Sequence, residues 1–131
     1  MLTTIRTTIA NKFIVTDLTR KLNLGPENEI ARLAFTYSLS TKIKFKLSEI
    51  LDAKGKEYSK NVLFGNYVSF YISLICIHYK IYKTDKDIPK YIKMHLDHGL
   101  DLLNAELKDR NNLSGFDFLV EKIESGLRHI E

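Results

Sequence analysis

Two histidines and two aspartates of one predicted helix are the residues of this chain best suited to metal chemistry. His95 and His98 lie one helical turn apart, with Asp97 and Asp101 beside them. A histidine pair at this spacing, joined by carboxylates, can begin a metal site. No third ligand follows at a motif spacing, so we expect no metal, no cofactor and no catalytic residue here.

Other catalytic signatures are missing from the sequence. Serine nucleophile motifs, phosphate-binding loops and glycine-rich dinucleotide turns do not occur. The single cysteine, Cys76, lies in the most apolar stretch, where burial makes a thiol unreactive, and it allows no internal disulfide. We therefore predict no independent catalytic activity. This cysteine usage and the lack of a signal-like start predict a cytoplasmic protein.

A lysine-rich stretch is the better candidate for function. Its ammonium groups suit phosphates, whose neutralisation releases counterions whatever the base sequence. The stretch has no arginine, which argues against bidentate reading of guanine. Arg20 and Lys21 are expected to add to the same face. The predicted nucleic-acid contact in the stretch consists of Lys42, Lys44, Lys46, Lys54, Lys56 and Lys60. A solvated lysine loop is the alternative.

The charge is unevenly distributed along the 131 residues. Residues 1–60 hold eleven Lys or Arg against six Asp or Glu, residues 61–96 hold five against two, and residues 97–131 hold four against eight. A basic front with an acidic end suggests an anionic partner. The length predicts one domain, which we take to be a helical DNA-binding domain over residues 1–131.

Two helices joined by a tight turn should open the fold. Apolar residues recur at helical spacing over 8–24, where the predicted stripe is Ile9, Phe13, Ile14, Leu18 and Leu22. Gly25-Pro26 ends this helix, and a second follows over 27–40, with Ile30, Leu33, Ala34 and Tyr37 on one face. Residues 3–8 before them form a short strand or an arm.

The lysine-rich stretch itself is predicted to be non-helical. Lysines alternate with Ile43, Phe45 and Leu47, a period of two that favours an extended segment over 41–48. Residues 52–61 are polar around Gly55 and predict a loop.

No charged residue occurs from Val62 to Tyr79. Gly65, Asn66 and other polar residues interrupt this stretch, so we expect no membrane span. A helix over 66–82 would be apolar on most sides and must be covered. Burial in a homo-oligomer and burial as the central helix of the chain remain open alternatives.

Two more helices complete the prediction. Pro89 suits the first turn of a helix that runs to about residue 110. After a turn over 111–115, Ser114 and Asp117 are spaced as the start of the last helix. The fold class is mostly α, with about five helices in a compact bundle behind the N-terminal arm or strand.

Three blocks of the sequence resemble the DndE family of DNA sulfur modification proteins. NEIARLAFTYSLS (28–40) is similar to its second helix, Phe64-Gly65-Asn66-Tyr67 to its Phe-Gly…Tyr segment, and HLDHGLDLL (95–103) to its His-Leu-x-x-Gly-x-x-x-Leu helix. The blocks follow in order over roughly residues 8–105. The acidic last helix lies outside the resemblance.

The resemblance implies a component of DNA phosphorothioation, a restriction-modification-type system in which sulfur replaces a non-bridging backbone oxygen. It implies a homo-tetramer that binds duplex DNA, preferably nicked, and works beside DndC and DndD. The arm and first two helices are also similar in topology to a ribbon–helix–helix module, in which residues 3–8 would pair between two chains.

Three functions follow from these observations. The first is a DNA-binding accessory subunit that uses the lysines. The second is an assembly adaptor that binds partner proteins through the apolar helix and no DNA. The third is a DNA-nicking enzyme that uses His95, His98 or Asp101 with a divalent ion.

Overall fold

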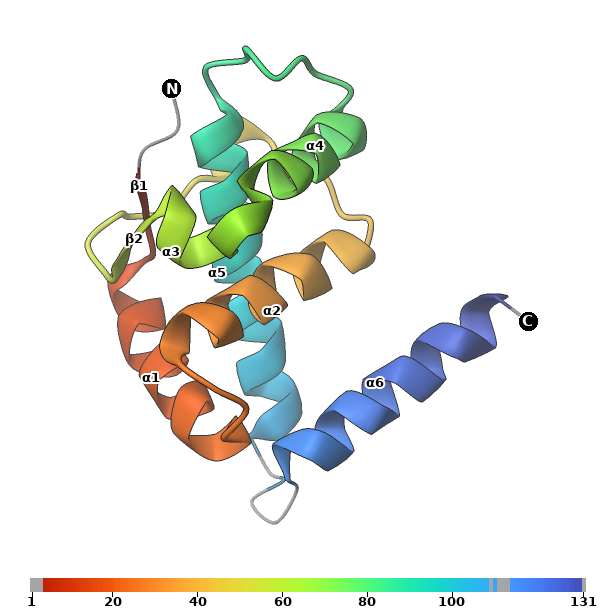
Figure 1. Cartoon of the computed structure of the whole chain (residues 1–131). Coiled ribbons are helices and arrows are strands. Elements are labelled where there is room, and N and C mark those ends of the chain that lie inside the picture. Colours follow the sequence, from red (N-terminus) through yellow and green to blue (C-terminus); the bar gives the residue numbers. More distant parts are fainter. Residues whose placement is uncertain (1–3, 109, 111–113, 131) are drawn as a thin grey trace.

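The longest helix of the computed structural model, α5 (Ile88–Leu107), runs through the middle of the fold (Figure 1). Its side chains are buried along nearly its whole length. Pro89 lies in its first turn, as predicted, because a helix start needs no N–H from that residue. The structure describes residues 4–108, 110 and 114–130. The predicted turn over 111–115 therefore lies largely outside the described residues.

The other helices of the described chain pack on α5 or on one another. They are α1 (Ile9–Leu22), α2 (Glu27–Ser40), α3 (Lys60–Phe64), α4 (Val68–Tyr79) and α6 (Gly115–Ile130). Two 3-10 turns, η1 (Leu47–Glu49) and η2 (Gly65–Tyr67), connect them. The mostly α-helical bundle is thus confirmed, and α3 is the helix that the sequence analysis did not separate.

Helix α1 begins and ends close to the predicted residues. The Thr8 hydroxyl accepts a hydrogen bond from the Asn11 N–H at its start, and Asn23, with φ 49°, ends it. The predicted apolar stripe is partly wrong, because Ile9 and Phe13 are exposed. Leu18 and Leu22 of the stripe are buried, as predicted, together with Asn11 and Val15.

A short antiparallel sheet replaces part of the predicted loop. Strand β1 (Thr4–Arg6) pairs with β2 (Glu57–Ser59), and Ile5 lies opposite Tyr58 with both side chains buried. The loop prediction over 52–61 is therefore wrong from residue 57 onward, since burial of Tyr58 outweighs the polarity of its neighbours. β1 has its partner in its own chain, whereas a ribbon–helix–helix module would pair it with a second chain.

Helix α4 lies on the surface of the bundle, so the alternative of burial as the central helix of the chain is wrong. Ile75 is its only fully buried residue. The helical residues Lys60–Tyr79 contain a window of mean hydropathy 1.4, which by length and composition would suffice to cross a membrane, and 17% of that window is buried. They are not one continuous α-helix, because Gly65 has φ 60° and η2 separates α3 from α4.

The most extensive helix contact in the core is the one between α2 and α5. At Gly99 the two backbones approach so closely that a Cβ atom would lie 1.8 Å from the Ala34 carbonyl oxygen. No side chain fits at that distance without moving one helix. Gly126 on α6 is the opposite case, since a Cβ atom there would meet nothing within 4 Å.

These two glycines give a matched test of the packing. Gly99→Ala should lower the free energy of unfolding by about 1–3 kcal/mol, because overpacking outweighs the gain of ~1 kcal/mol in helix propensity. Gly126→Ala should raise it by up to ~1 kcal/mol, since only the propensity changes. Urea unfolding of both variants checks this. Equal effects of the two substitutions would contradict the close contact between α2 and α5.

Candidate nucleic-acid interface

Lys42, Lys44 and Lys46, here called the lysine row, alternate with apolar residues on the segment that leaves α2. Lys42 turns the chain with φ 65°, residues 43–46 have no regular secondary structure, and η1 follows. The prediction of an extended segment over 41–48 is wrong at 41 and 42, which form a turn, and at 47 and 48, which belong to the 3-10 turn, whereas Lys46 is extended with φ −88° and ψ 146°. All three lysine side chains are exposed. Within the described residues none of them forms an ion pair.

The backbone of the lysine row is held against α4 and α5. The Phe45 ring packs edge-on against the rings of His95 and His98, with centroids 5.0 and 5.1 Å away. The Phe45 N–H donates to the Tyr79 hydroxyl over 3.0 Å. His78 Nε2 lies 2.6 Å from the Ile43 carbonyl oxygen. The segment is thus held by two backbone contacts and one ring, while its lysines point to solvent.

Behind Phe45 lies a chain of polar contacts, here called the histidine relay. Tyr79 Oη lies 2.6 Å from His95 Nε2, Ser38 Oγ lies 2.8 Å from His95 Nδ1, and the same Oγ lies 2.7 Å from His98 Nδ1. One proton arrangement satisfies the chain. The Tyr79 O–H donates to His95 Nε2, the His95 Nδ1–H donates to Ser38, and the Ser38 O–H donates to His98. Both imidazoles are then neutral.

Burial explains this neutrality. Ser38 and His95 are fully buried. Burial, with smaller contributions from His78 and His98, lowers the pKa of His95 to about 3, and burial also lowers the pKa of His98. Burial raises the pKa of Tyr79, which keeps its proton available to His95. The relay joins α2, α4 and α5 at the point where the lysine row attaches.

Asp97, which lies beside these histidines, makes contacts that hold the fold together, whereas Asp101 is exposed. Asp97 is buried, pairs with the Lys93 ammonium over 2.6 Å, and accepts from the Thr8 N–H and the Asn11 amide at 3.1 and 2.9 Å. Across the described residues, no three His, Cys, Asp or Glu side chains come together as a metal site would require. Asp97 thus fixes the start of α1 on α5.

The remaining predicted lysines lie apart from the lysine row. Lys54 and Lys56 are on the loop before β2, which is tied to β1 because the Gly55 N–H donates to Thr7 O and the Thr7 N–H to Lys56 O, both at 2.9 Å. The Lys56 ammonium lies 3.7 Å from Glu27. Lys60 begins α3.

Arg20 and Lys21 are also separate from the lysine row. They end α1, at the lower left of Figure 1, whereas the row follows the end of α2 at the right. Arg20 pairs with Asp17. The expected shared face is therefore divided into separate groups.

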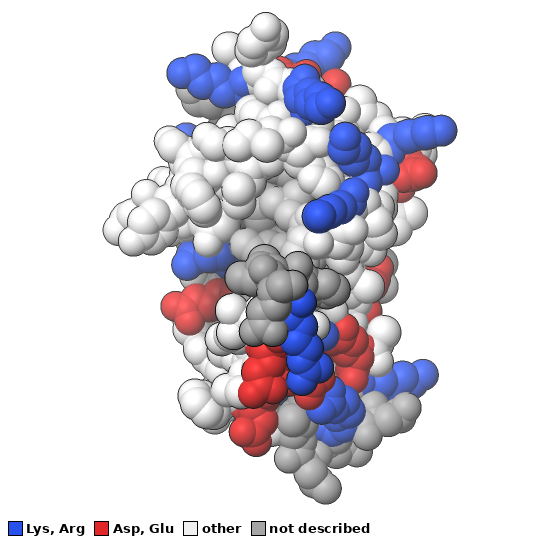
Figure 2. Space-filling view, turned by 90° about the vertical axis from the view of Figure 1, so that its right-hand side faces the viewer, with Lys and Arg blue, Asp and Glu red and all other residues white. Residues whose placement is uncertain are grey.

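Two lysines that the sequence analysis did not single out line a surface hollow together with one that it did. Lys83 and Lys86 line a hollow of about 450 Å³ together with Lys60 and Asp85. Figure 2 shows the face at the right of Figure 1, with blue side chains mainly in its upper half and red ones mainly in its lower half around α6. The sequence analysis did not single out Lys83 and Lys86, because lysine and aspartate alternate over 83–87 and the local net charge is small.

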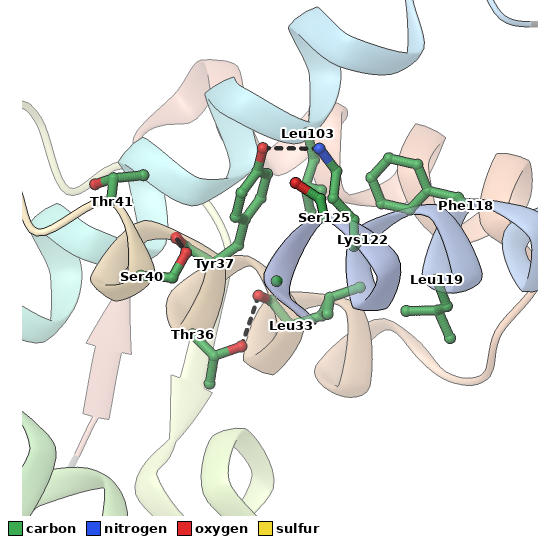
Figure 3. Close-up of a pocket in the computed structure, with 11 residues that line it drawn as sticks. Leu33, Thr36, Tyr37, Ser40, Thr41, Leu103, Phe118, Leu119, Lys122 and Ser125 are labelled. Carbon is green, nitrogen blue, oxygen red and sulfur yellow. Dashed lines mark hydrogen bonds between the residues drawn. The ribbon is translucent and has the colours of Figure 1, made fainter. Parts of the chain in front are cut away.

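A groove of about 540 Å³ separates α2 from α6 (Figure 3). Lys122 reaches across it to Glu106 at 2.7 Å and to the Tyr37 hydroxyl at 3.2 Å, and Tyr37 also donates to Glu106. Phe118 is buried at one end of the groove. These contacts attach α6 to the bundle along one side.

Comparisons with known proteins support the resemblance seen in the sequence. The family model described as DNA sulphur modification protein DndE matches residues 4–111. The solved structure of DndE from Escherichia coli B7A, described as involved in DNA phosphorothioation modification, has the same fold, with a TM-score of 0.63 at 18% identity over 79% of this chain and 99% of that chain. No curated protein matches the chain. The whole of α6 lies beyond the family match.

The histidine relay predicts a dependence of stability on pH. The unfolded chain binds a proton at His95 near pH 6.5 and the folded chain only near pH 3, so the unfolded state gains protons first as the pH falls. Stability should therefore be fully present above pH 6.5 and decrease toward pH 3, by on the order of 3 kcal/mol.

Urea unfolding between pH 7 and 4 measures this dependence. His95→Gln, which cannot titrate in this range, should be less stable at pH 7 and have a flatter dependence than the unchanged chain. Parallel curves for the two proteins would show that His95 is not the group responsible.

Proposed function

The chain belongs to the DndE family of DNA sulphur modification proteins, and we propose that it serves the DNA phosphorothioation system as an accessory subunit that binds duplex DNA. The lysine row contacts the sugar-phosphate backbone, and nicked duplex is the preferred form. DndC and DndD are its protein partners in this proposal. Its role is recruitment, without a catalytic residue of its own.

One observation carries the proposal: three exposed ammonium groups, without an ion-pair partner among the described residues, lie on a backbone segment that is already ordered. A flexible lysine loop loses conformational entropy when it binds, at roughly 1–2 kcal/mol for each residue that becomes fixed. Residues 43 and 45 are held by His78, Tyr79 and the two histidine rings before any ligand arrives. The free energy gained by electrostatic attraction to DNA is then not reduced by the cost of ordering this segment.

The residue types indicate how the DNA is read. Lysine is a point charge that neutralises phosphate without the planar fork with which arginine recognises guanine. Binding through the lysine row should therefore depend little on base sequence and strongly on salt. Such binding suits a subunit that brings other components to DNA.

Self-association is part of the proposal, with a homo-tetramer as the assembly. Helix α4 supports it by its exposed apolar side chains, among them Phe70 and Ile77, which are 58% and 74% exposed. Large exposed apolar patches mark interaction surfaces. The uncharged white area at the upper left of Figure 2 belongs to this part of the molecule.

The same surface favours a second candidate function, an assembly adaptor that contacts proteins alone. The two candidates differ in whether the purified chain binds DNA at low salt. For a nicking enzyme that uses His95, His98 or Asp101 the geometry offers less, because His95 has both ring nitrogens in the histidine relay and, across the described residues, no three possible metal ligands come together.

The proposal predicts the effect of reversing the lysine row. The triple variant Lys42→Glu, Lys44→Glu, Lys46→Glu should bind nicked duplex more than about tenfold more weakly, with a salt dependence shallower by about three in log–log slope, because three phosphate contacts are lost. Fluorescence anisotropy over a potassium chloride series measures both quantities. Helicity by circular dichroism should be unchanged, since all three side chains are exposed.

The matched control reverses three other exposed lysines, Lys12, Lys90 and Lys108, and so changes the net charge equally. It should retain most of the affinity. If both triple variants lose affinity alike, total charge and not the lysine row is responsible. Failure of the unchanged chain to bind any duplex at low salt would favour the adaptor.

A further inference from the structure

Lys60, Lys83 and Lys86 line a hollow that the proposed function does not use. It lies where the start of α3 comes beside the connection between α4 and α5, which crosses the top of Figure 1. The hollow, here called the lysine hollow, has a volume of about 450 Å³, which is within the range of small-molecule sites. Within the described residues, none of its three lysines forms an ion pair. Their ammonium groups are therefore available to a ligand.

Asp85 is the acid among the residues that line the lysine hollow, and it forms no ion pair with these lysines. Its carboxylate accepts a hydrogen bond from the Asp87 N–H over 2.8 Å, which holds it in the turn before α5. Asp87 itself is paired with Lys90 at 3.6 Å. Three ammonium groups against one carboxylate leave the lysine hollow with a net charge of +2.

The other lining residues add an apolar wall and one hydroxyl. The wall consists of Ile72 on α4 and of Ile88 and Pro89 in the first turn of α5. The hydroxyl is that of Thr84. Because the N-terminal end of a helix carries a partial positive charge, the start of α5 also favours an anion. The lysine hollow thus combines positive charge with a surface for an apolar group.

We propose that the lysine hollow binds a phosphate monoester, with the phosphate against the three lysines and the organic part of the ligand against the apolar wall. Two sources share this chemistry, a free nucleotide and the phosphorylated end of a nucleic-acid strand. The second source rests on the proposed function, because a nick in duplex DNA exposes such an end.

Charge favours a monoester over the sugar-phosphate backbone as the ligand. A phosphate monoester carries a charge of about −1.5 to −2 at pH 7, which matches the net charge of the lysine hollow. A backbone phosphodiester carries a single negative charge and would leave part of the positive charge uncompensated. Lysines suit either group as point charges, so the number of charges in one hollow, and not the residue type, indicates the monoester.

Two nicked duplexes of the same sequence test the strand end as the ligand. One has a phosphate at the nick and the other has a hydroxyl in its place. The unchanged chain should bind the phosphorylated nick about tenfold more tightly, since the duplexes differ only in a group that makes charge-assisted hydrogen bonds. Fluorescence anisotropy at one salt concentration gives both dissociation constants, and their ratio removes the contribution of the lysine row.

The variant Lys83→Gln, Lys86→Gln, here called the hollow variant, should bind both duplexes about equally. Both side chains are exposed, so the helicity should be unchanged. The matched control is Lys12→Gln, Lys108→Gln, which removes the same charge from two other exposed lysines. It should keep the preference for the phosphorylated nick.

Thymidine monophosphate and thymidine test the free nucleotide as the ligand. Each is titrated into the isotopically labelled chain, and the amide signals of Thr84 and of Lys86 are followed by nuclear magnetic resonance. The monophosphate should shift these signals and thymidine should not, because the phosphate supplies the charge that the lysines bind. The hollow variant should lose the response.

A phosphate preference that only the hollow variant loses supports the strand end, and a nucleotide response that it loses supports the free nucleotide. Equal binding of the two duplexes by the unchanged chain, together with no response to thymidine monophosphate, would overturn the inference. The same holds for a preference or response that the hollow variant keeps or that the control loses equally. A chain that binds no duplex at low salt would overturn the proposed function alone, because thymidine monophosphate then still tests the lysine hollow.

Discussion

The packing of Phe45 between His95 and His98 is the contact on which the proposed interface depends. It joins the segment after α2 to α5, and the Phe45 N–H adds a link to α4 through Tyr79. Without this contact the lysine row would be a free loop. With it, three ammonium groups are held at the surface by residues of α4 and α5. The core thus determines where the charges lie.

The same place shows why a histidine-rich helix need not be catalytic. His95 and His98 share one hydroxyl, that of Ser38, and this contact between α2 and α5 excludes solvent from His95. Neutral imidazoles are both donors and acceptors, so a chain of them can satisfy buried polar groups that a charged pair could not. This arrangement makes the stability of the fold sensitive to acid, because a proton on His95 Nε2 would remove the acceptor of the Tyr79 hydroxyl.

The sequence predicted the helices well where local signals were strong. Gly25-Pro26 separates α1 from α2, Pro89 opens α5, and Ser114 caps α6 through the Asp117 N–H. It could not predict β2, because a three-residue strand forms only when β1, more than fifty residues away, supplies its partner. It misjudged Ile9 and Phe13, since periodicity marks an apolar face without saying which neighbour covers it. The sequence analysis identified the lysines themselves. Their division into separate groups depends on the path of the chain in space, which composition does not determine.

The central claim is that the position of the lysine row, and not the total charge, determines DNA affinity. Phe45→Ala tests it most directly, because this substitution leaves every charge in place and removes the ring that holds the segment. The measurement is the dissociation constant for nicked duplex at one fixed salt concentration, with helicity monitored in parallel. We predict affinity about tenfold weaker at unchanged helicity, since the freed residues must be ordered on binding. Equal affinity of the variant and the unchanged chain would contradict the account.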